Sequence, residues 1–90
     1  MMFHKVKEIK TIGKYVLLVT FCDGTIKTYD IEPLFVEIEV FNTLKAIPYL
    51  FEQVKVDIGG YGICWNDEID LSCNELWDNG IICDIEKVGV

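Results

Sequence analysis

The 90-residue sequence contains no arginine, one histidine, one serine and no long apolar run. Arginine is the preferred side chain for contacts with phosphate and guanine, and nucleic-acid binders need a basic surface. Eight lysines oppose fifteen carboxylates and leave a net charge of −7, so we expect no direct binding to DNA or RNA. An acidic chain of this kind suits a basic partner protein better, although keeping the protein soluble is the more common role of an acidic surface.

The apolar segments are too short to cross a membrane, since a span needs about 18 consecutive apolar residues. The longest, Tyr15 to Cys22, has the length of one strand. The opening MMFHKVKEIK carries charge throughout and lacks the apolar segment of a secretion signal. We therefore expect no membrane association and a cytoplasmic location.

The four cysteines form no CxxC pair, which a structural zinc site would favour. Disulfides are not expected in a cytoplasmic chain. Cys22 and Cys64 lie in apolar strand patterns, where cysteine packs as a small buried hydrophobe. The sequence therefore predicts no metal site and no cofactor.

The first half of the chain predicts a hairpin followed by short helical turns. A charged strand over residues 4–10 suits a sheet edge, and residues 14–22 are apolar on both alternating faces, as in a central strand. Asp23-Gly24 then predicts a hairpin with a type I′ turn. Pro33 is compatible with the first turn of a helix over 31–37, and a further turn follows over 41–46.

The second half predicts another hairpin, formed by 54–58 and 61–65, with alternation resuming at 69–71. Ser72 and Glu75 match the capping box, in which the serine accepts one free amide and the glutamate reaches back to another. Asn79-Gly80 predicts a left-handed helix end.

Together these patterns predict a small single-domain α+β fold, with antiparallel hairpins of about six short strands and two or three short helices. The domain is expected to span residues 1–80. Residues 81–90 form a C-terminal tail that can add a strand or extend toward a partner.

The pattern resembles the bacterial domain of unknown function 2442. Its landmarks are the strand ending in Phe21-Cys22-Asp23-Gly24, the Tyr29-Asp30-Ile31 exit, the Phe41/Leu44 turn, Phe51, Val54, Val56-Asp57, Gly60, Ile63, Trp65, and Ile69-Asp70-Leu71-Ser72 followed by Leu76 and an aromatic residue. The string from Trp65 to Leu76 is the most specific part. Trp77 stands where the family usually has tyrosine.

The resemblance implies a small α+β domain without an established catalytic set. Members of the family look like partners of a small protein of the domain of unknown function 4160 type, in arrangements similar to toxin–antitoxin pairs. Some relatives continue into a helix-turn-helix domain, for which this sequence has no room after residue 80.

Five residues are candidates for a functional or turn-fixing role: Trp65, Asp67, Glu68, Asp70 and Trp77. Both tryptophans could anchor a partner, because tryptophan is enriched in interface hot spots, although in so small a chain the core is their more common place. The three carboxylates could bind a metal ion, but solvated turn carboxylates, or hydrogen bonds that fix the turn, are the more common role for such residues.

The leading hypothesis is a non-enzymatic interaction module that binds another small protein, as the acidic, antitoxin-like half of a pair. One alternative is a regulatory domain that acts on transcription through a separate DNA-binding partner. A second is a small metal-dependent hydrolase using Asp67, Glu68 and Asp70. A homodimer is compatible with all three, since small domains with free strand edges often pair.

Overall fold

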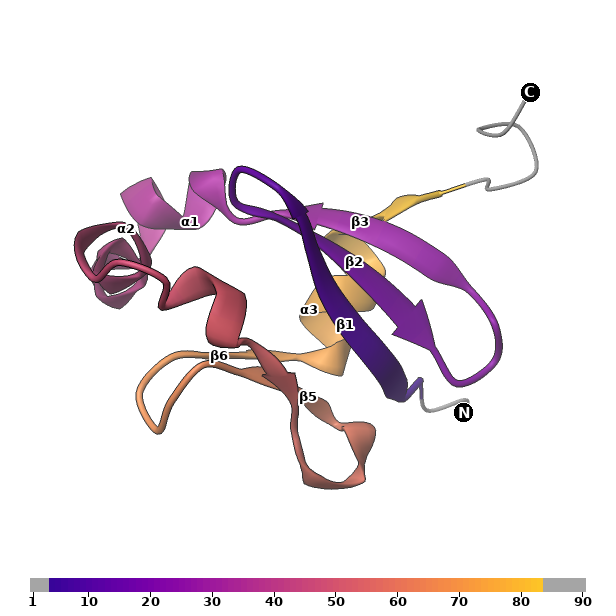
Figure 1. The fold of residues 1–90 in the computed structure, drawn as a ribbon. Helices are drawn as coiled ribbons and strands as arrows, with labels where there is room; N and C mark the ends of the chain where they lie inside the picture. The colour runs from indigo at the N-terminus through magenta and orange to yellow at the C-terminus, as the bar shows by residue number, and fades with distance from the viewer. Residues whose placement is uncertain (1–3, 84–90) are drawn as a thin grey trace.

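The computed structural model describes residues 4–83, which form seven strands, three α-helices and three 3-10 helices (Figure 1). The strands are β1 (Val6–Gly13), β2 (Val16–Phe21), β3 (Ile26–Asp30), β4 (Lys55–Val56), β5 (Gly62–Cys64), β6 (Asp70–Ser72) and β7 (Ile81–Ile82). The helices are α1 (Glu32–Glu37), α2 (Thr43–Ala46), α3 (Cys73–Asn79), η1 (Glu39–Asn42), η2 (Phe51–Gln53) and η3 (Ile58–Gly60). All strand pairs are antiparallel, and the expected small α+β fold is confirmed.

The larger sheet has the strand order β1-β2-β3-β7, so β2 is central and β1 lies at an edge, as predicted. Alternate β2 residues Leu17, Val19 and Phe21 are fully buried on the inner face. The residues between them are half-buried on the outer face, which no described element covers. β2 is therefore central in the sheet, with β1 and β3 on its two sides, and only its inner face is fully buried.

The predicted β2–β3 hairpin is confirmed, but its type I′ turn is wrong. A type I′ turn needs positive φ at both central residues, and only Gly24 has it, at 95°. The Gly24 N–H donates to the Phe21 carbonyl, and the Asp23 carboxylate accepts from the Thr25 N–H. This bond holds Asp23 in ordinary backbone geometry, and the loop is a three-residue turn with glycine at its left-handed position.

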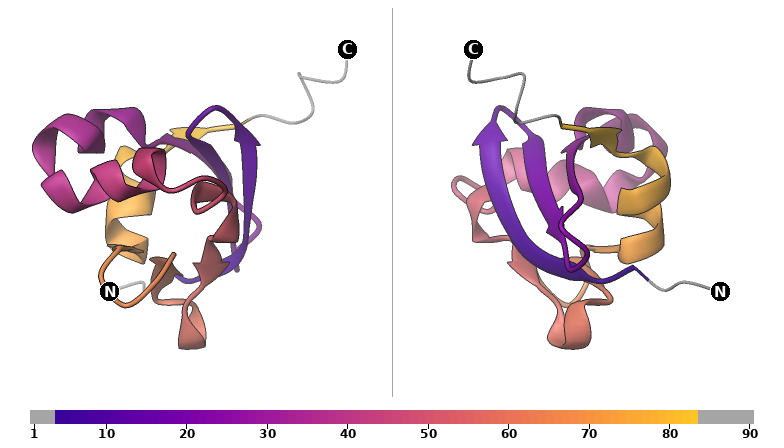
Figure 2. Two further views of the ribbon diagram at one scale, coloured as in Figure 1. Left: turned by 60° about the vertical axis from the view of Figure 1, so that its left-hand side comes forward. Right: turned by 90° about the vertical axis from the view of Figure 1, so that its right-hand side faces the viewer.

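The smaller sheet, β4-β5-β6, contains the second predicted hairpin and packs against the start of β1. Gly60 makes this approach possible, because a Cβ there would lie 2.7 Å from the carbonyl oxygen of Val6. Figure 2 shows the larger sheet forming one wall, with the smaller sheet and the helices on its concave side.

Helix α3 begins as predicted and ends differently. Ser72 Oγ accepts the Glu75 N–H at 3.1 Å, which confirms the N-cap. The Glu75 carboxylate does not return to the Ser72 amide, because it accepts the Tyr29 hydroxyl instead. Gly80 has φ −75° and ψ 155°, so the predicted left-handed end is wrong. The chain continues directly into β7, which requires extended backbone at this point.

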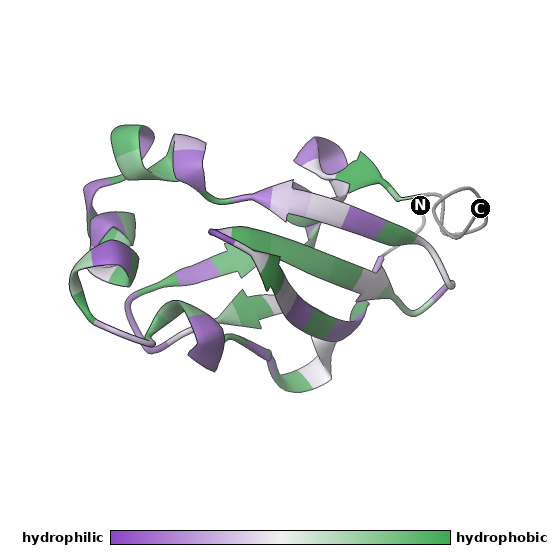
Figure 3. Ribbon diagram, turned by 45° about the horizontal axis from the view of Figure 1, so that its top comes forward, coloured by the Kyte–Doolittle hydropathy of each residue, from purple (hydrophilic) through white to green (hydrophobic). Residues whose placement is uncertain are grey.

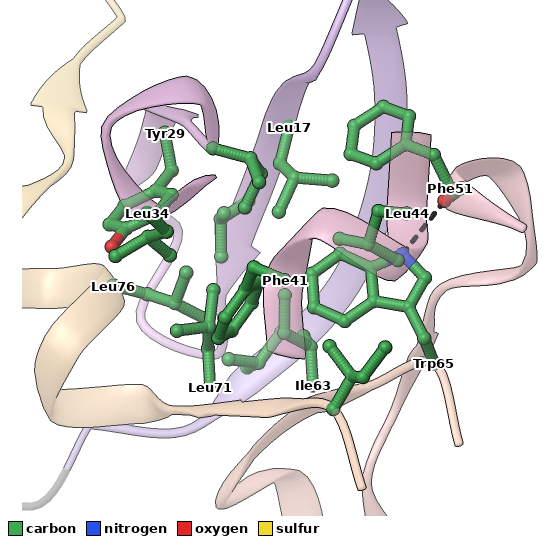
Figure 4. Close-up of a cluster of buried hydrophobic side chains, with 14 of the residues drawn as sticks. Leu17, Tyr29, Leu34, Phe41, Leu44, Phe51, Ile63, Trp65, Leu71 and Leu76 are labelled. Carbon is green, nitrogen blue, oxygen red and sulfur yellow. Dashed lines mark hydrogen bonds between the residues drawn. The ribbon is translucent and has the colours of Figure 1, made fainter. Parts of the chain in front are cut away.

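Most apolar side chains gather in one core between the two sheets and the helices (Figure 4). Trp65 belongs to this core with Phe41 and Phe51 beside it, and its indole N–H donates to the Phe51 carbonyl at 2.9 Å. Cys22 is exposed, which corrects the expected burial, because it lies in the hairpin turn rather than in the strand. Cys64 is only half-buried.

The longest described α-helix, α3, has seven residues. No helix in residues 4–83 has the length and apolar character needed to cross a bilayer. Residues 84–90, the rest of the predicted tail, lie outside the described part of the chain.

Candidate functional site

The two tryptophans singled out from the sequence occupy different surroundings. Trp65 is 5% exposed and belongs to the core. Trp77 is half-buried at the start of the larger sheet, where its ring stacks on His4 at 3.4 Å and packs edge-on against Phe21. The ammonium of Lys27 lies 4.2 Å from the ring centroid and donates to the Trp77 carbonyl.

Lys27 is the only buried charged residue in the described chain, and sequence reasoning missed it. The Trp77 carbonyl belongs to the last turn of α3, where backbone carbonyls lack helical partners and favour a cation. Lys27 therefore caps the C-terminal end of α3 and connects this helix to β3.

Asp67 and Glu68 lie exposed in the turn between β5 and β6, and Asp70 is exposed on β6 opposite Cys64. The turn is held by Asn66, whose side-chain oxygen accepts the Glu68 and Ile69 amides at 2.9 and 3.0 Å. Within residues 4–83, no group of three histidine, cysteine or carboxylate side chains is arranged to hold a metal ion. The three carboxylates are therefore not drawn together into a site.

The structure brings a different set of acidic residues together. A groove of about 590 Å³ opens between α1, β3, α3 and β7, and we call it the acidic groove. Its charged lining residues are Asp30, Glu37 and Glu75, and none of the described lysines lines it. Tyr29 and Leu34, seen side by side in Figure 4, contribute to its wall, and Ile81 lies at its margin.

Tyr29 and Glu75 connect the two sides of the acidic groove. The Tyr29 hydroxyl donates to Glu75 Oε2 at 2.7 Å, and Asn79 donates to the same oxygen at 2.8 Å. Burial, the hydrogen bond to Glu75 and the negative charges of Glu75 and Glu37 raise the pKa of the Tyr29 hydroxyl. The hydroxyl therefore stays protonated as a donor, and Glu75 Oε1 has no hydrogen-bond partner among residues 4–83.

Backbone dipoles add to the negative character of this groove. Glu37 and Asn79, the last residues of α1 and α3, both line it. Helix C-termini carry partial negative charge. The last turn of α1 has no basic residue, whereas the end of α3 is already bound by the Lys27 ammonium. A cationic side chain entering the groove would meet three carboxylates and the C-terminus of α1.

An apolar strand edge lies next to the acidic groove. β7 pairs with β3 through Thr28↔Ile81 and Lys27↔Ile82, and it ends the strand order of the larger sheet in the described chain. The Ile81 and Ile82 side chains are 72% and 69% exposed, and Figure 3 shows β7 as a hydrophobic segment. Such an edge can pair with another extended segment.

The residues of the acidic groove carry almost no signal in the sequence. Asp30 accepts the Glu32 N–H at the start of α1, a local role that its position does predict. Glu75 is part of the capping-box pattern, and Glu37 is one of many exposed carboxylates. Only the long-range packing of α3 on β3 brings them to one groove.

Comparison with known families supports the resemblance found in the sequence. The family model described as "Protein of unknown function (DUF2442)" matches residues 6–81. The chain belongs to the DUF2442 family. The matched residues include strands β1 to β6, all three α-helices and the first residue of β7. No curated protein and no solved structure matches the chain significantly.

Proposed function

We propose that this DUF2442 domain is a non-enzymatic interaction module that binds a small basic protein through the acidic groove. The observation that carries the proposal is the gathering of Asp30, Glu37 and Glu75 around one groove without a lining lysine. A lysine or arginine side chain of the partner would form charge-assisted hydrogen bonds with these carboxylates in place of its bonds to water. The net charge of −7 attracts a basic partner at longer range.

The strand edge beside the groove supports a particular binding mode. An extended partner segment can pair with the free edge of β7 while one basic side chain enters the acidic groove, because Ile81 belongs to both. Strand addition of this kind supplies affinity through backbone hydrogen bonds and specificity through side-chain pockets. The exposed Ile81 and Ile82 side chains would be covered in the complex.

The finer proposal is that the domain is the acidic, antitoxin-like member of a pair with a small protein encoded nearby. The acidic charge and the family resemblance support it. If the partner carries a helix-turn-helix unit, the same groove would serve a regulator of transcription. The surface contacts would be the same in both cases.

The test is to purify small basic proteins encoded beside this gene and measure binding by calorimetry. We compare the wild type with Glu37→Lys in the groove and with Glu68→Lys in the β5–β6 turn. Both variants change the net charge equally, and both sites are exposed. Glu37→Lys is expected to weaken binding at least about tenfold, because it puts a like charge against the partner's cation.

Glu68→Lys is expected to change the affinity less than about threefold, because only the long-range attraction falls. Equal losses in both variants would contradict a groove-specific site. Absence of binding by the wild type to every neighbouring protein would contradict the proposed function itself.

A further inference from the structure

A second, smaller hollow lies beside the β1–β2 turn, with a volume of about 200 Å³. We call it the lysine–tyrosine pocket. Its walls come from that turn, from α2 and from the segment leading into η2. Its charged and aromatic lining residues are Lys14, Tyr15, Lys45, Tyr49, Phe51 and Glu52. No predicted site residue and no residue of the acidic groove lines it.

The charge of this pocket is opposite to that of the whole protein. Lys14 and Lys45 bring two positive charges, and Glu52 is the single carboxylate among its described lining residues. Neither lysine forms an ion pair within residues 4–83. The Lys45 ammonium lies over the Phe35 ring at 4.8 Å. A local charge of about +1 in a chain of net −7 is suited to a monovalent anion.

The inner wall of the pocket is aromatic and firmly packed. The Tyr15 ring meets the Phe35 ring edge-on at 5.0 Å and the Phe51 ring at 5.4 Å. Leu44 adds an aliphatic surface. An anion with an apolar body as well as a charged group would therefore match both kinds of lining residue.

Two of the residues that line the pocket have a strained, left-handed backbone conformation. Tyr15 and Tyr49 have φ values of 62° and 67°, and in residues 4–83 they are the only residues other than glycine with positive φ. Glycine is the residue that adopts this conformation without cost, yet both positions carry tyrosine, and both line the pocket. Strained positions of this kind are enriched where ligands are held.

We propose that the lysine–tyrosine pocket binds a small aromatic monocarboxylate. The carboxylate would lie between the ammonium groups of Lys14 and Lys45, and the ring would pack against Tyr15 and Phe51. The volume admits one ring and its carboxyl group but is below the roughly 300 Å³ at which sites for drug-sized ligands begin. Phosphate has no ring to pack against Tyr15 and Phe51, so it would be held less well than an aromatic monocarboxylate.

The test is a titration of the isotope-labelled full chain, followed by amide resonances in NMR. The probes are benzoate, the uncharged isostere benzamide, and inorganic phosphate. Benzoate is expected to give saturable shifts at residues 14–15 and 44–52, with a dissociation constant of about 1 mM. Benzamide and phosphate are expected to bind at least about fivefold more weakly.

Three variants identify the source of the affinity: Lys14→Gln, Lys45→Gln and, as the matched control, Lys55→Gln. All three lysines are exposed, and Lys55 lies on β4 outside the pocket. Each pocket variant should weaken benzoate about threefold or more, and the control should not change it. The amide spectra also show that each variant is folded.

The proposal is overturned if benzoate produces no saturable shifts up to about 20 mM, the range of very weak binding. It is also overturned if benzamide binds as well as benzoate, or if phosphate binds more tightly. Equal loss in Lys55→Gln would show general charge attraction instead of a site. None of these outcomes depends on the acidic groove.

Discussion

The acidic groove and the lysine–tyrosine pocket differ in charge, size and construction. The groove has about 590 Å³ and three carboxylates, whereas the pocket has about 200 Å³ and two lysines. The groove is assembled from segments as distant as β2 and β7, and it continues into a free strand edge. The pocket is lined by the β1–β2 turn, by α2 and by the segment leading into η2, with aromatic side chains on its inner wall.

One small sheet therefore borders two unlike hollows. Tyr15 lines the pocket and Val16, its neighbour in the chain, lines the groove. A large groove that opens onto a strand edge fits a polypeptide segment. A small aromatic pocket fits a single small molecule. The variants below, ordered from the largest expected effect to the smallest, test what holds each hollow in place.

Trp65→Ala is expected to have the largest effect, because both hollows depend on the shared core. Loss of this buried side chain and its bond to the Phe51 carbonyl should lower the free energy of unfolding by about 3–5 kcal/mol. Urea denaturation measures the change. Ile58→Ala, at a side chain that is 94% exposed, should change it by less than about 0.5 kcal/mol. A loss below about 1 kcal/mol for Trp65→Ala would show that the tryptophan is not a core element.

Tyr29→Phe tests the acidic groove alone. It removes the hydroxyl that donates to Glu75 and should lower the free energy of unfolding by about 1–2 kcal/mol near pH 7. Tyr61→Phe is the control, because its ring is 64% exposed. Little or no loss in Tyr29→Phe would mean that the hydrogen bond to Glu75 does not stabilise the groove.

The pH dependence of Tyr29 has a definite sign. Its pKa in the folded protein is raised above the ordinary 10.0, so the unfolded chain releases this proton first as the pH rises. The stabilisation by Tyr29 is therefore complete below about pH 10 and is lost as the pH rises further. Stability of the wild type should fall above pH 10 more steeply than stability of Tyr29→Phe, as followed by urea denaturation. Parallel curves would contradict this linkage.

Tyr49→Gly tests the strain in the lysine–tyrosine pocket. The left-handed φ of Tyr49 costs about 1–2 kcal/mol, and its side chain is 80% exposed, so little packing is lost. Glycine brings an entropic cost of about 0.5–1 kcal/mol, so we expect a net gain of about 0.5 kcal/mol. The control is Tyr61→Gly, at a position with φ of −79°, which should only destabilise. Equal destabilisation by both would argue against strain at Tyr49.

Local patterns in the sequence predicted the parts of the fold that local interactions determine. The β2–β3 hairpin and the Ser72 cap form as expected, because turn and capping residues act within a few positions. The type of the hairpin turn was wrong, because the local bond from Thr25 to the Asp23 carboxylate favours a three-residue loop. Two further details were wrong where distant contacts compete. Glu75 bonds to Tyr29 instead of its own helix start, and Gly80 has the extended backbone that leads into β7 instead of a left-handed helix end.

The candidate site was less predictable than the fold. The sequence drew attention to Asp67, Glu68 and Asp70, because carboxylates that are close in the chain are easy to see. Their side chains lie on a turn and a short strand at the surface. The acidic groove was missed, since Asp30, Glu37 and Glu75 come to line one groove only through the packing of α3 against β3.

The most direct test of docking in the acidic groove is to map the partner's contact surface on the isotope-labelled domain by NMR. A neighbouring basic protein is expected to shift the amides of Tyr29, Glu37, Asn79 and Ile81 and to leave those of Lys14 and Lys45 unchanged. Shifts confined to the turn at Asp67–Asp70, or to the lysine–tyrosine pocket, would contradict the acidic groove as the docking site.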